Sequence, residues 1–456
     1  MSKVSKKTST KHTKKEKETK TKSKSKSKKK EKKTKKTKKK EIKETNKLVL
    51  NVEEARQVNA PDLDEIKSFV YKDIVIRSSP VAQISLKKKK KFKDDWDRVH
   101  YAHPNGGWLY RNKSIIKRQR KIVWEIIKNM AGNIFKNERD LSTITMPVTI
   151  FEPRSYLHRL VDIFQFAPIF LRQAALAKDP IERMKFVICF AVAGIHNTVA
   201  QAKPFNPILG ETFQGTFVDG TKIYCEQICH HPPISAFEII EKNDLYHLHG
   251  KGQFKSTFKG YSVSGRSEGD VTIDFSDGGR IVFSTPMLHL KGIIFGDRIV
   301  EYTSTAPFRD ESNNLYCELT FNPDPRGWIK SVFTSSNSNP TDYFHGEIMK
   351  KATKNQKEEK ICEVNGSWLG RIDFDDLTYF SLNDGWHPVT VYECDEVLPS
   401  DCKNRQDLNQ LKLGNLKESG KEKHKLEVLQ RKDAKLRKKA TKKSKKNQKQ
   451  KKKSKK

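Results

Sequence analysis

The sequence predicts a β-dominated α+β fold with a large antiparallel sheet or barrel at its centre. Three observations predict it. An apolar stripe of helical period begins near Ile115, short alternating runs follow Pro204, and the chain turns helical and increasingly basic from about Asp407. Helices should therefore precede and follow the sheet.

Both ends of the chain are rich in lysine. Residues 1–50 hold 23 lysines and 5 glutamates, and residues 431–456 hold 16 lysines or arginines and one aspartate, so residues 51–430 carry only +3 of the net charge of +36. Such ends cannot bury enough apolar surface to offset their ordering entropy. We expect disordered tails at 1–47 and 441–456 that are solvated only, bind anionic membrane surfaces, or bind nucleic acid without sequence preference.

Seven cysteines, an odd number without a CxxC pair, occur in a chain with no signal-peptide pattern. These features indicate free thiols in a reducing cytosol. The most apolar stretch, residues 186–195, is about half the roughly 20 residues that a membrane span needs. We expect a cytoplasmic protein without a transmembrane anchor.

Residues 48–114 show too little pattern for a domain, and we expect a linker of uncertain structure there. The segment that follows has apolar residues at helical spacing, which would form one apolar face of a helix: Ile122, Val123, Ile126, Ile127, Met130, Ala131 and Ile134. This stripe fits a helix packed on its own core, and it equally fits a lid that changes partners.

Two further helices are predicted before the strands. One covers about 155–166, with Ser155 as its cap after Pro153, and the other covers about 181–201 after the start signal Asp179-Pro180. Beyond Pro204, alternating runs such as 212–217, 245–249 and 271–275 are separated by Gly, Asn and Asp at hairpin spacing. They predict at least ten sequential antiparallel strands, enough for a barrel that holds a cavity.

The segment Glu226-Gln227-Ile228-Cys229-His230-His231-Pro232-Pro233 places two histidines before two prolines. The prolines stiffen the chain and exclude a helix, so the two imidazole side chains project from a non-helical turn. The pair could be structural, or it could bind an anion. A metal site with Cys225 and Cys229 is disfavoured, because in a strand these two lie more than about 12 Å apart.

This segment resembles the oxysterol-binding-protein fingerprint EQVSHHPP, with Ile228 in place of Val and Cys229 in place of Ser. The stretch 203–212 is similar to the family's KPFNPxLGE signature, and further similarity extends over about 115–440. Residues 398–407 follow the LPPTDSRxRPD pattern only loosely. No pleckstrin-homology domain or ankyrin repeat is recognised in the N-terminal quarter.

The resemblance implies an incomplete antiparallel β-barrel that encloses a lipid tunnel, with an N-terminal lid at about 115–140 and a C-terminal helical segment. It implies a lid that includes Trp124, Ile127 and Met130, preceded by basic residues that can meet an anionic bilayer. It also implies a phosphatidylinositol 4-phosphate headgroup site composed of Lys203, Asn206, His230, His231, Lys423, Glu427 and Arg431. Glu427 would orient its basic neighbours at i−4 and i+4.

The function implied is the extraction and exchange of phosphatidylinositol 4-phosphate and a second lipid between membranes. A sterol is the expected second lipid, and phosphatidylserine is the alternative. We expect lipids and anionic membrane surfaces as partners, no specific nucleic acid, no obligate protein partner, no metal and no cofactor. An enzyme that uses Cys229 with an adjacent histidine is disfavoured, because neighbouring residues of a strand do not reach each other easily.

Overall fold

The computed structural model describes residue 98 and residues 101–129, 139–140, 146–200, 202–258, 261–322, 340–353, 357–384 and 386–453. All of them belong to one compact unit, residues 79–456. The expected N-terminal tail and most of the expected linker lie outside the described residues.

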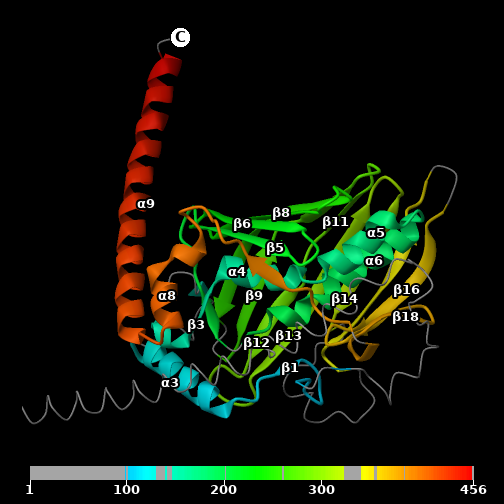
Figure 1. The fold of residues 1–456 in the computed structure, drawn as a ribbon, viewed down its shortest axis with the longest axis horizontal. Helices are drawn as coiled ribbons and strands as arrows, with labels where there is room; N and C mark the ends of the chain where they lie inside the picture. The colour runs from blue at the N-terminus through cyan, green and yellow to red at the C-terminus, as the bar shows by residue number, and fades with distance from the viewer. Residues whose placement is uncertain are drawn as a thin grey trace, which may run out of the picture. The chain divides into compact units, whose positions relative to one another are not determined.

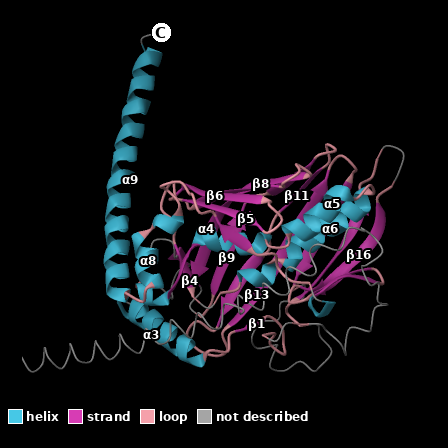
Figure 2. Cartoon of the chain, in the orientation of Figure 1, coloured by secondary structure: helices cyan, strands magenta, loops and turns pink. Residues whose placement is uncertain are grey.

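An antiparallel sheet of seventeen strands makes up most of the described chain (Figures 1 and 2). Its strands are β1 (Trp108–Leu109), β2 (Arg139–Asp140), β5 (Thr212–Phe217), β6 (Lys222–Cys229), β7 (Ile234–Ile240), β8 (Tyr246–Phe258), β9 (Val263–Glu268), β10 (Val271–Phe275), β11 (Arg280–Phe283), β12 (Met287–Lys291), β13 (Ile299–Asp310), β14 (Leu315–Phe321), β15 (Tyr343–Lys350), β16 (Glu359–Ser367), β17 (Arg371–Phe374), β18 (Leu377–Ser381) and β19 (Val391–Glu393). Burial alternates strictly along β5 and β10, as expected for strands with one face on the core. The predicted β-dominated fold is confirmed.

Two long strands hold the sheet together. Strand β8 pairs with β10 through residues 246–250 and with β9 through residues 253–258, while β13 pairs with both β12 and β11. Strands β5, β6 and β7 continue the sheet beyond β8, and β14 to β18 continue it beyond β13. Among the described residues, the pairings of β18 are with β17 and those of β19 are with β5, so the sheet is not closed between these two strands.

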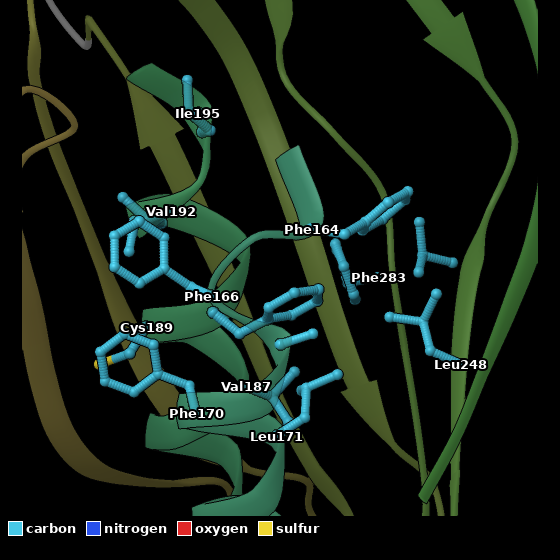
Figure 3. Close-up of a cluster of buried hydrophobic side chains, with 14 of the residues drawn as sticks. Phe164, Phe166, Phe170, Leu171, Val187, Cys189, Val192, Ile195, Leu248 and Phe283 are labelled. Carbon is cyan, nitrogen blue, oxygen red and sulfur yellow. The ribbon is translucent and has the colours of Figure 1, made fainter. Parts of the chain in front are cut away.

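Short helices fill the inside of the sheet: α4 (Tyr156–Leu160), α5 (Arg172–Leu176) and α6 (Pro180–Ala193), with 3-10 turns at Val148–Ile150, Val161–Phe164 and Ile195–Thr198 and a π turn at Ala167–Leu171. Helix α6 is apolar on almost every side and packs against β17 and β18. Phe164, Phe166 and Phe170 lie against it, and Leu248 and Phe283 complete the cluster from the sheet (Figure 3). This cluster closes one end of the interior.

The predicted helix starts are confirmed by their caps. Ser155 Oγ accepts a hydrogen bond from the Leu157 amide at the start of α4, and Asp179 Oδ1 accepts one from the Ile181 amide at 3.0 Å at the start of α6. Helix α6 ends at Ala193, earlier than the predicted 201. A Cβ on the next residue, Gly194, would lie 2.0 Å from the Ile163 carbonyl oxygen, so the chain here passes too close to its neighbour for any side chain.

The last part of the expected linker is integrated in the fold. Strand β1 pairs with β13, and Arg98 forms an ion pair with the buried Asp342, which also accepts a hydrogen bond from the Gly107 amide. Gly106 has φ +110°, and a Cβ there would lie 1.9 Å from the Thr341 amide nitrogen. The glycines that suggested a loop therefore permit a close contact, and the linker prediction is wrong for residues 101–112.

The C-terminal region consists of α8 (Gln406–Lys412) and the long helix α9 (Leu416–Lys453) (Figure 1). We expected a disordered tail from residue 441. Instead, α9 continues to Lys453. Residues 421–453 contain neither Gly nor Pro and are rich in Lys, Arg and Gln, which favour helix. Low hydrophobicity therefore does not prevent local helix formation in this segment. No helix in the described ranges combines the length and apolarity that a bilayer span requires.

Candidate functional site

A cavity of about 820 Å³ lies inside the sheet and is bounded by three further parts of the chain. Helix α3 (Lys113–Asn129) lies on one side, the segment from β3 (Phe151–Ser155) to β4 (Lys203–Phe205) on another, and the first half of α9 on a third. Most of its wall is apolar and includes Phe164, Phe190, Phe237, Phe283 and Leu288. All seven residues predicted to bind the headgroup line this same cavity.

Lys203 and Asn206 enter the site from β4 and the turn that follows it. Strand β4 pairs in parallel with β3, which sets Lys203 opposite Phe151. The Lys203 ammonium donates to Asn206 Oδ1 and lies 5.1 Å from the centre of the Phe151 ring. Burial, and then the nearby charge of Lys423, lower the pKa of Lys203 to about 8.

Helix α9 brings three of the predicted residues to the site from one face. Lys423 Nζ lies 2.5 Å from Glu427 Oε1, and Arg431 Nη1 lies 4.0 Å from Glu427 Oε2. Lys423 Nζ also lies 5.6 Å from the centre of the Phe151 ring, so both lysines lie within 6 Å of one aromatic ring. The carboxylate of Glu427 thus lies between two cations of its own helix.

His230 and His231 lie in the turn between β6 and β7, as the two prolines predicted. The register of β6 and β7 is irregular at Gln227 and Cys229, so strand alternation no longer applies when the chain reaches the pair. Both imidazoles line the cavity, and their ring centres lie 4.5 Å apart.

The imidazole of His230 is partly buried, and its Nδ1 is shielded from solvent. Burial and then the neighbouring charges of His231 and Arg437 lower its pKa to about 4, although a hydrogen bond to the Pro207 carbonyl raises it. Its Nδ1 is buried and has no hydrogen-bond partner among the described residues. His230 is therefore neutral at pH 7 and retains an unused hydrogen-bonding nitrogen.

A buried ion cluster that the sequence did not reveal supports this side of the site. Arg405 donates to Glu211 Oε2 at 2.7 Å, to Asp407 Oδ2 at 2.6 Å and to the Asn206 carbonyl at 3.0 Å. Glu211 in turn accepts from the Ile208 amide. These bonds fix the 206–211 loop that carries Asn206. Arg405 and Asp407 belong to the loosely matched stretch 398–407, and no local pattern identified their role.

Gln430 of α9 is a second residue that the sequence interpretation missed. It lines the cavity between Glu427 and Arg431, and its Nε2 is buried without a partner in the described part of the chain. Helical spacing of three and seven residues from Glu427 and Lys423 would have identified it.

Helix α3 occupies the place predicted for the lid. Its Ile127 is 4% exposed and packs on Phe258 and Ile293, whereas Trp124 is 45% exposed and does not line the cavity. Arg298, itself buried, donates to Gln119 Oε1 of this helix at 3.0 Å. The Ile122 and Ile127 face therefore covers the cavity, Trp124 faces outward, and Met130 lies outside the described residues.

The site is suited to an amphiphile with an anionic head. Five cationic or imidazole groups, from Lys203, His230, His231, Lys423 and Arg431, line it, while the remaining wall offers apolar surface of the kind that takes hydrocarbon. A volume of about 820 Å³ falls within the range of about 300–1,000 Å³ found for small-molecule sites. Outside the site, the described residues include one grouping with metal-ligand geometry, on the sheet.

Three comparisons with known proteins agree with this geometry. The family model described as "Oxysterol-binding protein" matches residues 122–456. Oxysterol-binding protein 9 of Dictyostelium discoideum is 37% identical over 355 residues, which cover 76% of this chain and 82% of that protein. Oxysterol-binding protein-related protein 8 of Homo sapiens is 32% identical over 231 residues, which cover 49% of this chain and 24% of the human protein.

Two solved structures share the fold. The Osh3 ORD of Saccharomyces cerevisiae in complex with PI(4)P is 24% identical with a TM-score of 0.56, over 69% of this chain and 84% of that one. The Osh1 ORD domain in complex with ergosterol is 22% identical with a TM-score of 0.55, over 79% of this chain and 85% of that one.

Proposed function

The chain belongs to the oxysterol-binding protein family, and we propose that it binds phosphatidylinositol 4-phosphate and a sterol in one cavity and exchanges them between membranes. Proteins of this family bind and carry lipids and are not enzymes. The observation that carries the proposal is the convergence of seven polar residues, from three separate segments, at one end of a single apolar cavity.

Each group has a distinct task in headgroup binding. A phosphomonoester carries a charge of about −1.5 to −2 near neutral pH. Lys203 and Lys423 supply positive charge beside Phe151, and Arg431 can donate two parallel hydrogen bonds to phosphate oxygens. Glu427 would repel a phosphate at close range, so its task is to hold Lys423 and Arg431 in position.

The unused Nδ1 of His230 offers a further hydrogen bond to the headgroup. A phosphate near this ring would raise its pKa, so that binding draws a proton from solution. His231, 4.5 Å away between ring centres, is close enough to contact the same group. The two histidines would then recognise the phosphate, and the inositol hydroxyls would meet Asn206 and Gln430.

Enclosure of the acyl chains follows from the cost of exposing them. At about 0.8 kcal/mol per methylene, ten methylenes cost about 8 kcal/mol, which is about six decades in equilibrium constant. Lipid must therefore pass directly between cavity and bilayer. Helix α3 is the element that would move, because its apolar face forms part of the cavity wall.

Extraction from liposomes tests the proposal. Liposomes that contain labelled phosphatidylinositol 4-phosphate and labelled sterol are incubated with wild type, Lys423→Ala and His230→Ala/His231→Ala. We expect each variant to lose phosphoinositide extraction at least tenfold, since each lost charge-assisted hydrogen bond contributes about 1.5–3 kcal/mol. Sterol carries no phosphate, and its extraction should persist.

Lys425→Ala is the matched control for Lys423→Ala. Lys425 lies two residues further along α9, pairs with Glu422 and does not line the cavity. Wild-type phosphoinositide extraction by both Lys423→Ala and the double histidine variant would show that the headgroup assignment is wrong. If phosphatidylserine were extracted in place of sterol, the second cargo would be wrong and the headgroup site would stand.

A further inference from the structure

Two histidines lie on the outer face of the sheet, away from the lipid cavity. They flank Leu248 in β8, and Leu248 is fully buried in the core cluster (Figure 3). Because side chains alternate along a strand, His247 and His249 point to the opposite face. Their ring centres are 5.0 Å apart, and each side chain is 42% exposed.

Neighbouring strands place one carboxylate on each side of this pair. Glu238 of β7 lies opposite His249, and Asp274 of β10 lies opposite His247. The contacts run diagonally: His247 Nε2 lies 2.7 Å from Glu238 Oε1, and His249 Nε2 lies 3.0 Å from Asp274 Oδ2. Both Nε2 atoms therefore meet carboxylate oxygens from opposite sides.

The ligand atoms are close enough to share an ion. One donor atom from each of His247, His249 and Asp274 lies within 4.8 Å of the other two. Ligands of a tetrahedral zinc ion at about 2.0–2.1 Å from the metal lie about 3.3 Å apart. Rotation of the side chains can shorten the separations from at most 4.8 Å to about 3.3 Å. The backbone need not move, and β8 is held in place by pairing with β7 and β10.

Arg280 favours this arrangement. Its Nε lies 2.5 Å from Asp274 Oδ1, which leaves Oδ2 directed toward His249. A carboxylate held through one oxygen presents the other in a fixed direction, as is typical of metal-binding carboxylates. Two imidazoles with one or two carboxylates form a ligand set that suits zinc and similar divalent ions.

We propose that the outer face of the sheet binds one divalent transition-metal ion through Nε2 of His247, Nε2 of His249 and the carboxylate of Asp274, with Glu238 as the fourth ligand. The two carboxylates balance the charge of the ion. The ion would join β7, β8 and β10, which also supply Ser235, Phe237, Gly252 and Val271 to the cavity wall. It would stiffen that wall without contacting lipid, and the proposal does not depend on the lipid function.

Metal titration of the full chain tests the site. Protein freed of metal with a chelator is titrated with Zn²⁺ by calorimetry and with Co²⁺ by visible absorption. We expect one equivalent bound in wild type, a four-coordinate Co²⁺ spectrum without thiolate charge transfer, and a higher melting temperature with Zn²⁺. His247→Ala/His249→Ala should weaken binding at least a hundredfold and abolish the melting shift.

His345→Ala is the control, since His345 is exposed on β15 and belongs to no such group. Melting without metal shows whether the double variant folds, and Glu238→Gln provides a milder variant that should weaken binding about tenfold. Absence of saturable binding in wild type would overturn the proposal. So would equal binding by the double variant, or a thiolate band that places the ion on cysteines.

Discussion

The protonation of single residues in the site depends on their burial and on neighbouring charges. Lys203 and Lys423 come from segments more than two hundred positions apart and meet at the Phe151 ring. Their mutual repulsion and the burial of Lys203 favour loss of a proton, and an arriving phosphate would reverse this effect. A bound phosphate would therefore stabilise the charged form of both lysines.

The pKa of Lys203 leads to a prediction about pH. With a pKa of about 8 in the free protein, the ammonium loses its proton above pH 8, and phosphate binds only the charged form. Affinity for a short-chain, soluble phosphatidylinositol 4-phosphate should therefore fall as pH rises from 8 to 9, by up to about tenfold per unit for one proton. Calorimetry at pH 7, 8 and 9 measures it.

Lys203→Arg is the informative variant, because arginine stays charged throughout this range. Its affinity should fall less than that of the wild type as the pH rises from 8 to 9. A flat profile in the wild type would mean that Lys203 keeps an ordinary lysine pKa and that this description of the site is incorrect.

Arg405 lies behind the site and yields a prediction about stability. It is 7% exposed at the side chain and pairs with Glu211 and Asp407, both fully buried. Arg405→Leu would leave two uncompensated carboxylates, at a cost of about 3–5 kcal/mol in the free energy of unfolding. Urea denaturation measures the loss. Lys403→Ala, two residues away, should change stability by less than about 1 kcal/mol.

The sequence predicted residues that line the cavity better than those that support them. Lys203 and the His230-His231 pair belong to short, nearly unaltered motifs, so their positions could be identified directly. Arg405 pairs with Glu211, which is 194 residues away in sequence, and that pairing cannot be seen in any local pattern. Trp124 and Ile127 are only three residues apart on α3, so the sequence did not reveal that Ile127 is buried while Trp124 is 45% exposed.

At the scale of elements, α3 is attached to the body by a small apolar cluster and by hydrogen bonds of Arg120 and Arg298. Its apolar face meets the small cluster of Phe258 and Ile293, and Arg298 holds Gln119. An element held by so small a cluster can open while the sheet stays folded. This separation is what a lid requires.

Ile127→Ala should loosen α3 selectively. Truncating a buried isoleucine costs about 2–5 kcal/mol, which here would be taken from closure of the helix. Amide hydrogens of α3 should exchange at least tenfold faster while the melting temperature of the sheet stays within a few degrees. Trp124→Ala is the control, since Trp124 is 45% exposed and should leave exchange unchanged. Equal effects of the two variants would contradict a lid closed by its Ile127 face.

At the scale of elements, alternation of apolar residues predicted the strands well, whereas residue composition incorrectly predicted disorder at the C-terminal end and a linker at residues 104–107. The alternation of 212–217 and 271–275 predicted β5 and β10 at their observed bounds, because burial on one face determines that pattern. The lysine-rich end predicted disorder, yet α9 is helical to Lys453. Turn residues at 104–107 suggested a linker, but their contact partner Thr341 is distant in sequence.

For the whole molecule, net positive charge is concentrated at the two ends of the sequence. Residues 441–456 contain ten lysines and no acidic residue. Each lysine near an anionic leaflet contributes about 1 kcal/mol, and salt screens this attraction. We propose that this end and residues 1–50 recruit the protein to membranes.

Removal of residues 441–456 should weaken binding to anionic vesicles at low salt and leave it nearly unchanged at high salt. Phosphoinositide extraction at saturating vesicle concentration should be intact, because these residues lie beyond those that line the cavity. Vesicle sedimentation at two salt concentrations measures the first effect. Loss of extraction at saturation would contradict a recruiting role.

The central claim is that one cavity takes either of two lipids and never both. Native mass spectrometry of the full chain, after incubation with vesicles that contain phosphatidylinositol 4-phosphate and sterol, weighs the occupants directly. We predict chains that carry a single phosphoinositide or a single sterol, with the first population lost in Lys423→Ala. A chain that carries both lipids at once, or wild-type phosphoinositide occupancy in Lys423→Ala, would contradict the claim.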